Sequence, residues 1–123
     1  MNYRVYLKKY EVLRKEAERD LSLGMYNKAV SGFWFSIEAL LRYLIMKSGK
    51  TPPERAGPLI SKFINELIYK LDAKKKLREL LNGLYIKRRE VDHRRKIADE
   101  AYAVRAYSKY REIIEIIEKN VSF

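Results

Sequence analysis

The segment FWFSIEALLRYLIM, residues 33–46, decides the fold of this 123-residue chain. Its apolar residues recur every three or four positions, which is the spacing of one face of an α-helix. Further apolar residues extend onto the neighbouring faces: Trp34, Phe35, Leu41, Ile45 and Met46. Because a helix that is apolar on most sides must be covered on most sides, we expect this one to be the central helix of a bundle.

This helix is not expected to span a membrane. Glu38 and Arg42 interrupt it, and its apolar run is shorter than the roughly 20 residues that a bilayer requires. The N-terminal residues also lack the apolar core of a signal peptide. The sequence therefore predicts a cytoplasmic protein without a membrane partner.

The composition predicts one domain, residues 1–123, with a single hydrophobic core. Cysteine is absent and histidine occurs once, which excludes disulfides and thiolate metal sites and argues against a zinc site in one chain. We expect neither a metal nor a cofactor. The 35% of charged residues and the absence of cysteine and glutamine favour a thermophilic source.

The remaining sequence indicates further helices and no strands. Three predicted helices span about residues 3–22, 25–48 and 58–71. A fourth begins at residue 73, and the last spans about residues 98–120. Gly24 and Gly49 are expected to end the first two helices, Pro58 to lie in the first turn of the third, and Asp72 to cap the fourth. The predicted fold class is all-α, an up-and-down four-helix bundle with one additional short helix.

Basic charge is concentrated in one segment. The net charge is +11, and residues 74–96 contain ten basic and three acidic residues, so they carry +7 of it. A local excess of Lys and Arg is typical of a nucleic-acid-binding surface, since such side chains neutralise phosphates. The alternative is a protein that is merely basic.

Arg88 stands where the helix pattern requires a core residue. The apolar stripe Leu77, Leu81, Leu84 continues to Arg88 in the same steps of three or four. A charge at such a position must be paired or must line a cleft. Alternatively, its aliphatic stem packs while its guanidinium reaches water near a helix end.

His93, the only histidine, follows five residues after Arg88. On a continuous helix these two side chains would leave about 140° apart. They can therefore share a site only if the helix distorts or ends between them, or if two chains contribute to the site.

Two stretches carry a resemblance to a known family. The resemblance covers almost the whole chain, mainly as a pattern of helices with aromatic and small residues at the packing positions. The first is GLYIKRREVDH, residues 83–93, followed by a long helix that contains AYAVRAYSKYREIIEIIEK, residues 101–119. The second is AERDLSLGMYNKAVSGFWFSIEALLRYLIMKSG, residues 17–49, followed by a loop with prolines. In these segments the chain resembles a HEPN domain. The short motif of that family is Arg, four to six residues, then His, and Arg88 and His93 match it.

The resemblance implies a helical bundle that forms homodimers, in which the Arg and His motifs of two subunits meet at a shared cleft. Many HEPN domains are metal-independent endoribonucleases, including toxins of toxin–antitoxin pairs. Others are inactive partners encoded beside a minimal nucleotidyltransferase.

In such a site the catalytic residues would be Arg88 and His93. His93 would transfer protons, and Arg88 would stabilise the charge of the phosphate. The residues expected to bind phosphate or RNA are Lys87, Arg89, Arg94 and Arg95.

This chain departs from the family pattern at two positions. Arg89 follows the motif arginine, where active members often carry Asn, Asp or His. Arg95 stands where some partners of nucleotidyltransferases carry a modified Tyr. Glu90 and Asp92 are available to pair with the arginines, which would make the cluster a network of surface ion pairs.

Three functions therefore remain open. The first is a metal-independent ribonuclease, the toxin of a nucleotidyltransferase–HEPN type toxin–antitoxin module. The second is a catalytically inactive module that binds nucleotide or RNA, or docks onto a nucleotidyltransferase. The third is a basic helical domain that only mediates assembly.

Two features favour a homodimer or a close helix contact. The ten tyrosines together with Trp34, Phe33 and Phe35 exceed what one small bundle easily buries. Gly83 inside a helix costs about 1 kcal/mol relative to Ala, which predicts a close backbone approach within the bundle or across a dimer.

Overall fold

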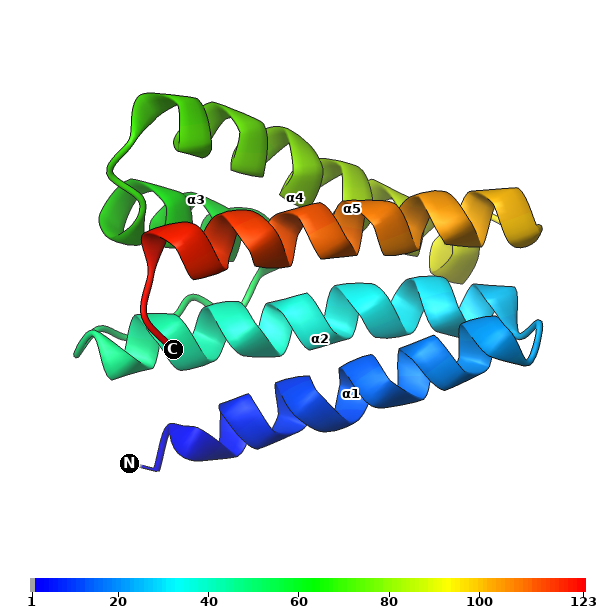
Figure 1. The fold of residues 1–123 in the computed structure, drawn as a ribbon, viewed down its shortest axis with the longest axis horizontal. Helices are drawn as coiled ribbons and strands as arrows, with labels where there is room; N and C mark the ends of the chain where they lie inside the picture. The colour runs from blue at the N-terminus through cyan, green and yellow to red at the C-terminus, as the bar shows by residue number, and fades with distance from the viewer. Residues whose placement is uncertain (1) are drawn as a thin grey trace.

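The computed structural model describes residues 2–123, which form five α-helices and no strand (Figure 1). The helices are α1 (Arg4–Ser22), α2 (Tyr26–Lys47), α3 (Ala56–Leu67), α4 (Leu71–His93) and α5 (Glu100–Asn120). The predicted all-α class is confirmed. Helix α3 has 12 residues, whereas the other four have 19 to 23.

Helix α2 is the central helix, as residues 33–46 predict. It contacts each of the other four helices, and Figure 1 shows it between α1 and α5. The ring of Phe33 lies 5.3 Å from that of Tyr107 and 5.1 Å from that of Tyr110 on α5. On the α4 side, Trp34 lies 5.1 Å from Tyr85. Aromatic pairs at these separations add to the stability gained from burying the rings.

By length and composition alone, α2 is a helix that could cross a membrane. Its most apolar 18-residue window is 67% buried inside the protein. The other helices therefore cover the apolar surface that would otherwise face lipid.

Gly24 and Gly49 end α1 and α2, as predicted. Their φ angles are 76° and 87°, a left-handed conformation that glycine adopts without steric cost. At the end of α1, this turn lets the amide of Met25 donate to the carbonyl of Asp20 at 2.8 Å, which satisfies an otherwise free helix carbonyl. The short link makes α1 and α2 antiparallel neighbours (Figure 1).

Among the glycines, the close approach between two helices is at Gly32, not at Gly83. A Cβ atom at Gly32 would lie 2.9 Å from the Cβ of Ala17 on α1. A Cβ at Gly83 would meet only the side chain of Lys109, at 3.5 Å. Within residues 2–123 no backbone approaches Gly83 closely, so that part of the prediction is wrong. A close approach across a dimer stays a prediction.

Helix α3 begins and ends earlier than predicted. It starts at Ala56, so Pro58 still lies in the first turn, where proline is tolerated. It ends at Leu67 because Ile68 is extended, with φ −108° and ψ 124°. The predicted end near residue 71 is therefore wrong.

The starts of α4 and α5 also differ from the prediction. Helix α4 starts at Leu71, so Asp72 lies in its first turn and does not cap it. There its carboxylate interacts favourably with the positive end of the helix dipole. Helix α5 starts at Glu100, and its cap is Asp99, whose Oδ1 accepts a hydrogen bond from the Tyr102 amide at 2.8 Å.

Candidate active site

The guanidinium of Arg88 is held between α4 and α2. Its Cζ lies 4.9 Å from the ring centroid of Phe35 on α2. Its Nε lies 2.9 Å from Oδ2 of Asp92, one turn further along α4. The buried Nε–H does not point at this oxygen, so the contact is an ion pair without a well-directed hydrogen bond. The side chain of Arg88 is 20% exposed.

Asp92 connects this ion pair to α2. Its second oxygen, Oδ1, accepts a hydrogen bond from Oγ of Ser31 at 2.6 Å. The contacts Ser31–Asp92–Arg88 therefore join the beginning of α2 to the end of α4. Within residues 2–123 the Nη groups of Arg88 have no hydrogen-bond partner, so they can bind a phosphate in the two-pronged manner of arginine.

The charge that Arg88 places on the apolar stripe is paired, as one of the alternatives predicts. Its guanidinium lies over the ring of Phe35 on α2, and its charge is met by Asp92. The phenyl ring of Phe35 adds a favourable cation–π contact. Arg88 is thus ordered without being fully buried.

A groove of about 500 Å³ adjoins the Ser31–Asp92–Arg88 contacts, between α1, the first half of α2 and the end of α4. Its wall carries three carboxylates, Glu16, Asp20 and Asp92, and one amine, Lys28. In the part of the chain that the structure describes, no three metal-ligating side chains gather in a way that could hold a metal ion. The acidic wall repels anions such as phosphates, so this groove does not favour an anionic ligand.

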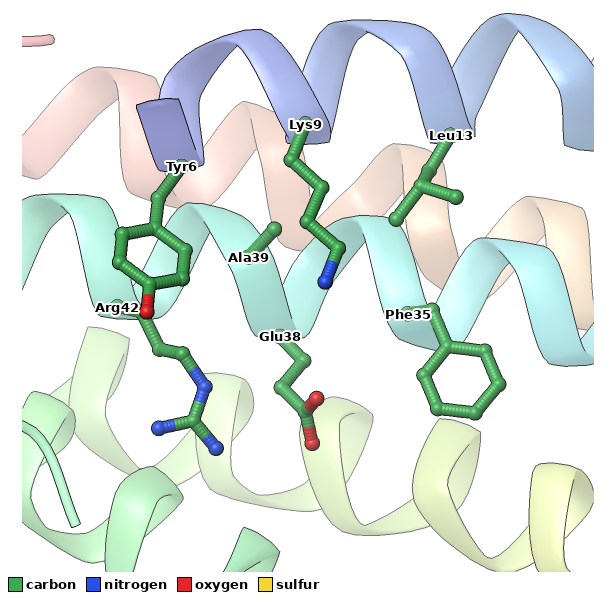
Figure 2. A pocket seen from close by; sticks show the side chains of 7 residues that line it. All are labelled: Tyr6, Lys9, Leu13, Phe35, Glu38, Ala39 and Arg42. Atoms are coloured by element: carbon green, nitrogen blue, oxygen red, sulfur yellow. The ribbon is translucent and has the colours of Figure 1, made fainter. Parts of the chain in front are cut away.

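A smaller pocket of about 160 Å³ lies further along α1 and α2 (Figure 2). Phe35 and Leu13 line both cavities. Figure 2 shows Phe35 at one end of this pocket and Tyr6 with Arg42 at the other. Arg42 donates hydrogen bonds to two loop carbonyls at 2.7 and 2.8 Å, so this arginine anchors the loop between α2 and α3.

His93 is the last residue of α4 and is exposed. Because α4 neither ends nor breaks between Arg88 and His93, the two side chains leave the helix about 140° apart. Arg88 turns toward α2, and His93 does not share that face. A site shared by Arg88 and His93 would need a distorted helix, a helix that ends between them, or two chains. Only the contribution of two chains is compatible with a continuous α4.

The four predicted phosphate-binding residues surround the end of α4. Arg89 is exposed and lies 5.9 Å from the ring of Tyr85. Arg94 and Arg95 are exposed in the turn after the helix. Lys87 points to α5, where its Nζ lies 3.7 Å from the ring centroid of Tyr102. They form a basic surface around Arg88 and do not converge on one point.

The turn that leaves α4 contains a strained residue. Arg95 has φ 60°, a left-handed conformation that costs roughly 1–2 kcal/mol for a residue with a Cβ. The amides of Arg94 and Lys96 both donate to the carbonyl of Glu90, at 3.2 and 3.1 Å. Asn27 of α2 holds the following segment through a hydrogen bond of 2.7 Å. The basic residues of this turn are therefore presented in a defined conformation.

Two neighbours of the basic surface carry no signal in the sequence. Tyr102 donates a hydrogen bond to Oε1 of Glu90 at 2.9 Å. Burial, together with this hydrogen bond, raises the pKa of Tyr102 to about 12. The second such neighbour is Ser31. A serine at an ordinary helix position gives no indication of a hydrogen-bond partner on a distant helix.

Comparisons with known proteins agree with this fold. The crystal structure of TT1696 from Thermus thermophilus is similar over 98% of this chain and 100% of that chain, with a TM-score of 0.71 and 19% identity. At this identity the likeness shows a shared fold. No curated protein matches the chain. The HEPN domain family model matches residues 3–120, and since this is nearly the whole chain, the protein belongs to the HEPN domain family.

Proposed function

We propose that this protein is a metal-independent endoribonuclease that acts as a homodimer. One observation carries the proposal. Arg88, the arginine of the family motif, is held by Asp92 and Phe35, and no hydrogen bond from residues 2–123 occupies its Nη groups. The motif histidine, His93, is exposed on the same helix.

The chemistry follows from these two side chains. The 2′-oxygen of the RNA attacks the adjacent phosphorus while the bond to the 5′-oxygen breaks. His93 either accepts the proton of the 2′-hydroxyl while water protonates the leaving 5′-oxygen, or donates a proton to the 5′-oxygen while water accepts the proton of the 2′-hydroxyl. Arg88 binds the phosphate and stabilises the negative charge that develops on it.

The geometry of α4 favours a site to which two copies of the chain contribute. Since Arg88 and His93 leave the helix about 140° apart, the site combines Arg88 of one copy with His93 of the other. A symmetric dimer then contains two such sites.

In each copy the four long helices form an up-and-down bundle, with α3 as the additional short helix.

The exposed residues Arg89, Arg94 and Arg95, together with Lys87, bind the RNA backbone in this proposal. This role gives a reason for the concentration of basic residues in the segment 74–96, which carries most of the net charge of the chain. Binding through phosphates releases counterions, so RNA affinity falls steeply as salt is raised.

In the cell, we assign the enzyme the role of a toxin in a nucleotidyltransferase–HEPN type toxin–antitoxin module, with a minimal nucleotidyltransferase as its partner protein. The support is membership of the HEPN domain family and the Arg–His motif. The chain carries this out in the cytoplasm.

The test is cleavage of an end-labelled structured RNA in the presence of EDTA. The wild type cleaves, whereas His93→Ala does not, and both unfold at the same temperature because His93 is exposed. Cleavage by His93→Ala at the wild-type rate removes the assignment of this residue. An inactive wild type removes the nuclease.

One contact favours a second candidate, a catalytically inactive nucleotide- or RNA-binding module that docks onto a nucleotidyltransferase. Asp92 already lies 2.9 Å from Nε of Arg88, and a carboxylate so close competes with a phosphate for the same guanidinium. This candidate predicts salt-dependent RNA binding without turnover.

A further inference from the structure

Four basic side chains gather where α4 meets α5. They are Lys87, Lys96, Arg105 and Lys109, and we call them the α4/α5 cation cluster. Lys87 and Arg88 are consecutive and therefore leave α4 about 100° apart. Lys87 points to α5, while Arg88 points to α2, so the cluster is distinct from the contacts that hold Arg88.

Three members of the cluster surround a single aromatic ring. Nζ of Lys87 lies 3.7 Å from the ring centroid of Tyr102, and Nζ of Lys96 lies 4.9 Å from it. Cζ of Arg105 lies 5.9 Å from the same centroid. Each charge gains from the electron-rich ring face, but the ring carries no negative charge that could neutralise them.

The fourth member extends the cluster along α4. Nζ of Lys109 lies 3.5 Å from where a Cβ of Gly83 would be. Gly83 precedes Lys87 by one turn on the same face of α4. On α5, Arg105 and Lys109 are likewise one turn apart. The four charges therefore form a short strip between the two helices, with the side chain of Lys109 beside Gly83.

The strip is not neutralised by the protein. Within residues 2–123, none of its four side chains forms an ion pair or a side-chain hydrogen bond. The nearby carboxylate of Glu90 accepts the hydrogen bond of Tyr102 and only partly offsets the positive charges around Lys87. The pKa of Lys87 is lowered, first by partial burial and then by the positive charges of Arg105 and Lys109. Crowded like charges of this kind are stabilised by a bound anion.

We propose that the α4/α5 cation cluster binds a second phosphate of the RNA chain, apart from the phosphate at Arg88. Ammonium and guanidinium groups supply the several hydrogen-bond donors that a phosphate accepts. The inference rests on the proposed function, because both phosphates belong to one RNA strand that crosses the end of α4 from the α5 side to the α2 side. This crossing places the scissile bond near Arg88.

The experiment measures binding of a fluorescent single-stranded RNA by anisotropy over a range of salt concentrations. All variants carry His93→Ala, so that the RNA is not cut. Arg105→Gln with Lys109→Gln removes two charges of the cluster. The matched control, Lys8→Gln with Lys15→Gln, removes two exposed charges from α1. Thermal unfolding checks that both double variants fold.

The slope of log affinity against log salt concentration reports the number of phosphate contacts. Losing one or two contacts in a single strand lowers its magnitude by about 0.7 to 1.4. We expect this loss in the cluster variant and not in the control. Equal slopes in the two variants overturn the proposal but leave the nuclease intact if Arg88 and His93 still prove necessary for cleavage. Absence of RNA binding by the His93→Ala parent and the wild type overturns both.

Discussion

The carboxylate of Asp92 lies 2.9 Å from Nε of Arg88, one turn away on the same helix. This pair is poorly arranged for stabilising a helix, since the acidic residue follows the basic one and lies near the negative end of the helix dipole. Its second oxygen is bound to Ser31 of α2. The pair is therefore best explained as a device that fixes the guanidinium of Arg88 relative to α2.

Replacement of Asp92 by Asn should separate positioning from binding. We expect the cleavage rate to fall by about tenfold to a hundredfold, because a misplaced catalytic group of this kind loses that much. RNA affinity should be kept or increased, since the substitution removes a negative charge from a basic surface. The control is Asp72→Asn, which removes an exposed carboxylate from the first turn of the same helix. Faster cleavage by Asp92→Asn would instead identify Asp92 as an inhibitor of Arg88.

Replacement of Arg95 by Gly should raise the stability of the protein and lower its affinity for RNA. Glycine adopts the φ of 60° found at this position without strain, so we expect stabilisation by up to about 1 kcal/mol. RNA affinity should fall because one phosphate contact is lost. Arg94→Gln removes an equal charge at a residue with φ −124° and should weaken RNA binding without raising stability. Chemical denaturation measures the difference, and a less stable Arg95→Gly variant would contradict the role given to this turn.

Replacement of Gly32 by Ala should destabilise the bundle. The new Cβ would lie 2.9 Å from the Cβ of Ala17, and overpacking of this kind costs about 1–3 kcal/mol. The gain in helix propensity, about 1 kcal/mol, offsets only part of this cost. Gly83→Ala is the matched control, since its Cβ meets only a flexible lysine at 3.5 Å, and it should stabilise the protein. Thermal unfolding of the two variants should move in opposite directions, and equal shifts would refute the packing argument.

Tyr102 should make stability depend on alkaline pH. Its pKa is raised to about 12 by burial and by the hydrogen bond to Glu90, so the folded protein keeps a proton that the unfolded chain loses near pH 10. The stabilising contribution is complete below pH 10 and is lost between about pH 10 and 12. The free energy of unfolding should fall more steeply over this range in the wild type than in Tyr102→Phe. Parallel curves for the two proteins would contradict this.

Much of the fold could be predicted because the signals for it are local. The central position of α2 follows from an apolar pattern that covers most of its surface, and the ends of α1 and α2 follow from Gly24 and Gly49. The end of α3 could not be predicted in this way. No glycine or proline marks the break at Ile68, and the apolar spacing continues through it.

The site could be predicted only in part. The position of Arg88 on an apolar stripe showed that its charge needs a partner, but helical spacing gives the face of a residue and not its neighbour on another helix. Ser31 and Asp92 are 61 residues apart in sequence. The contact of Lys87 with Tyr102 likewise depends on how α4 packs against α5. These contacts became visible only in the structure.

The most direct test of a site shared by two copies is a mixing experiment in EDTA with Arg88→Ala and His93→Ala. Each variant alone should be inactive. After mixing in equal amounts and subunit exchange, half of the dimers are heterodimers with one intact site each, so roughly a quarter of the wild-type cleavage should return. A mixture that stays inactive while the wild type is active, with subunit exchange verified by tagged copies, would contradict the shared site.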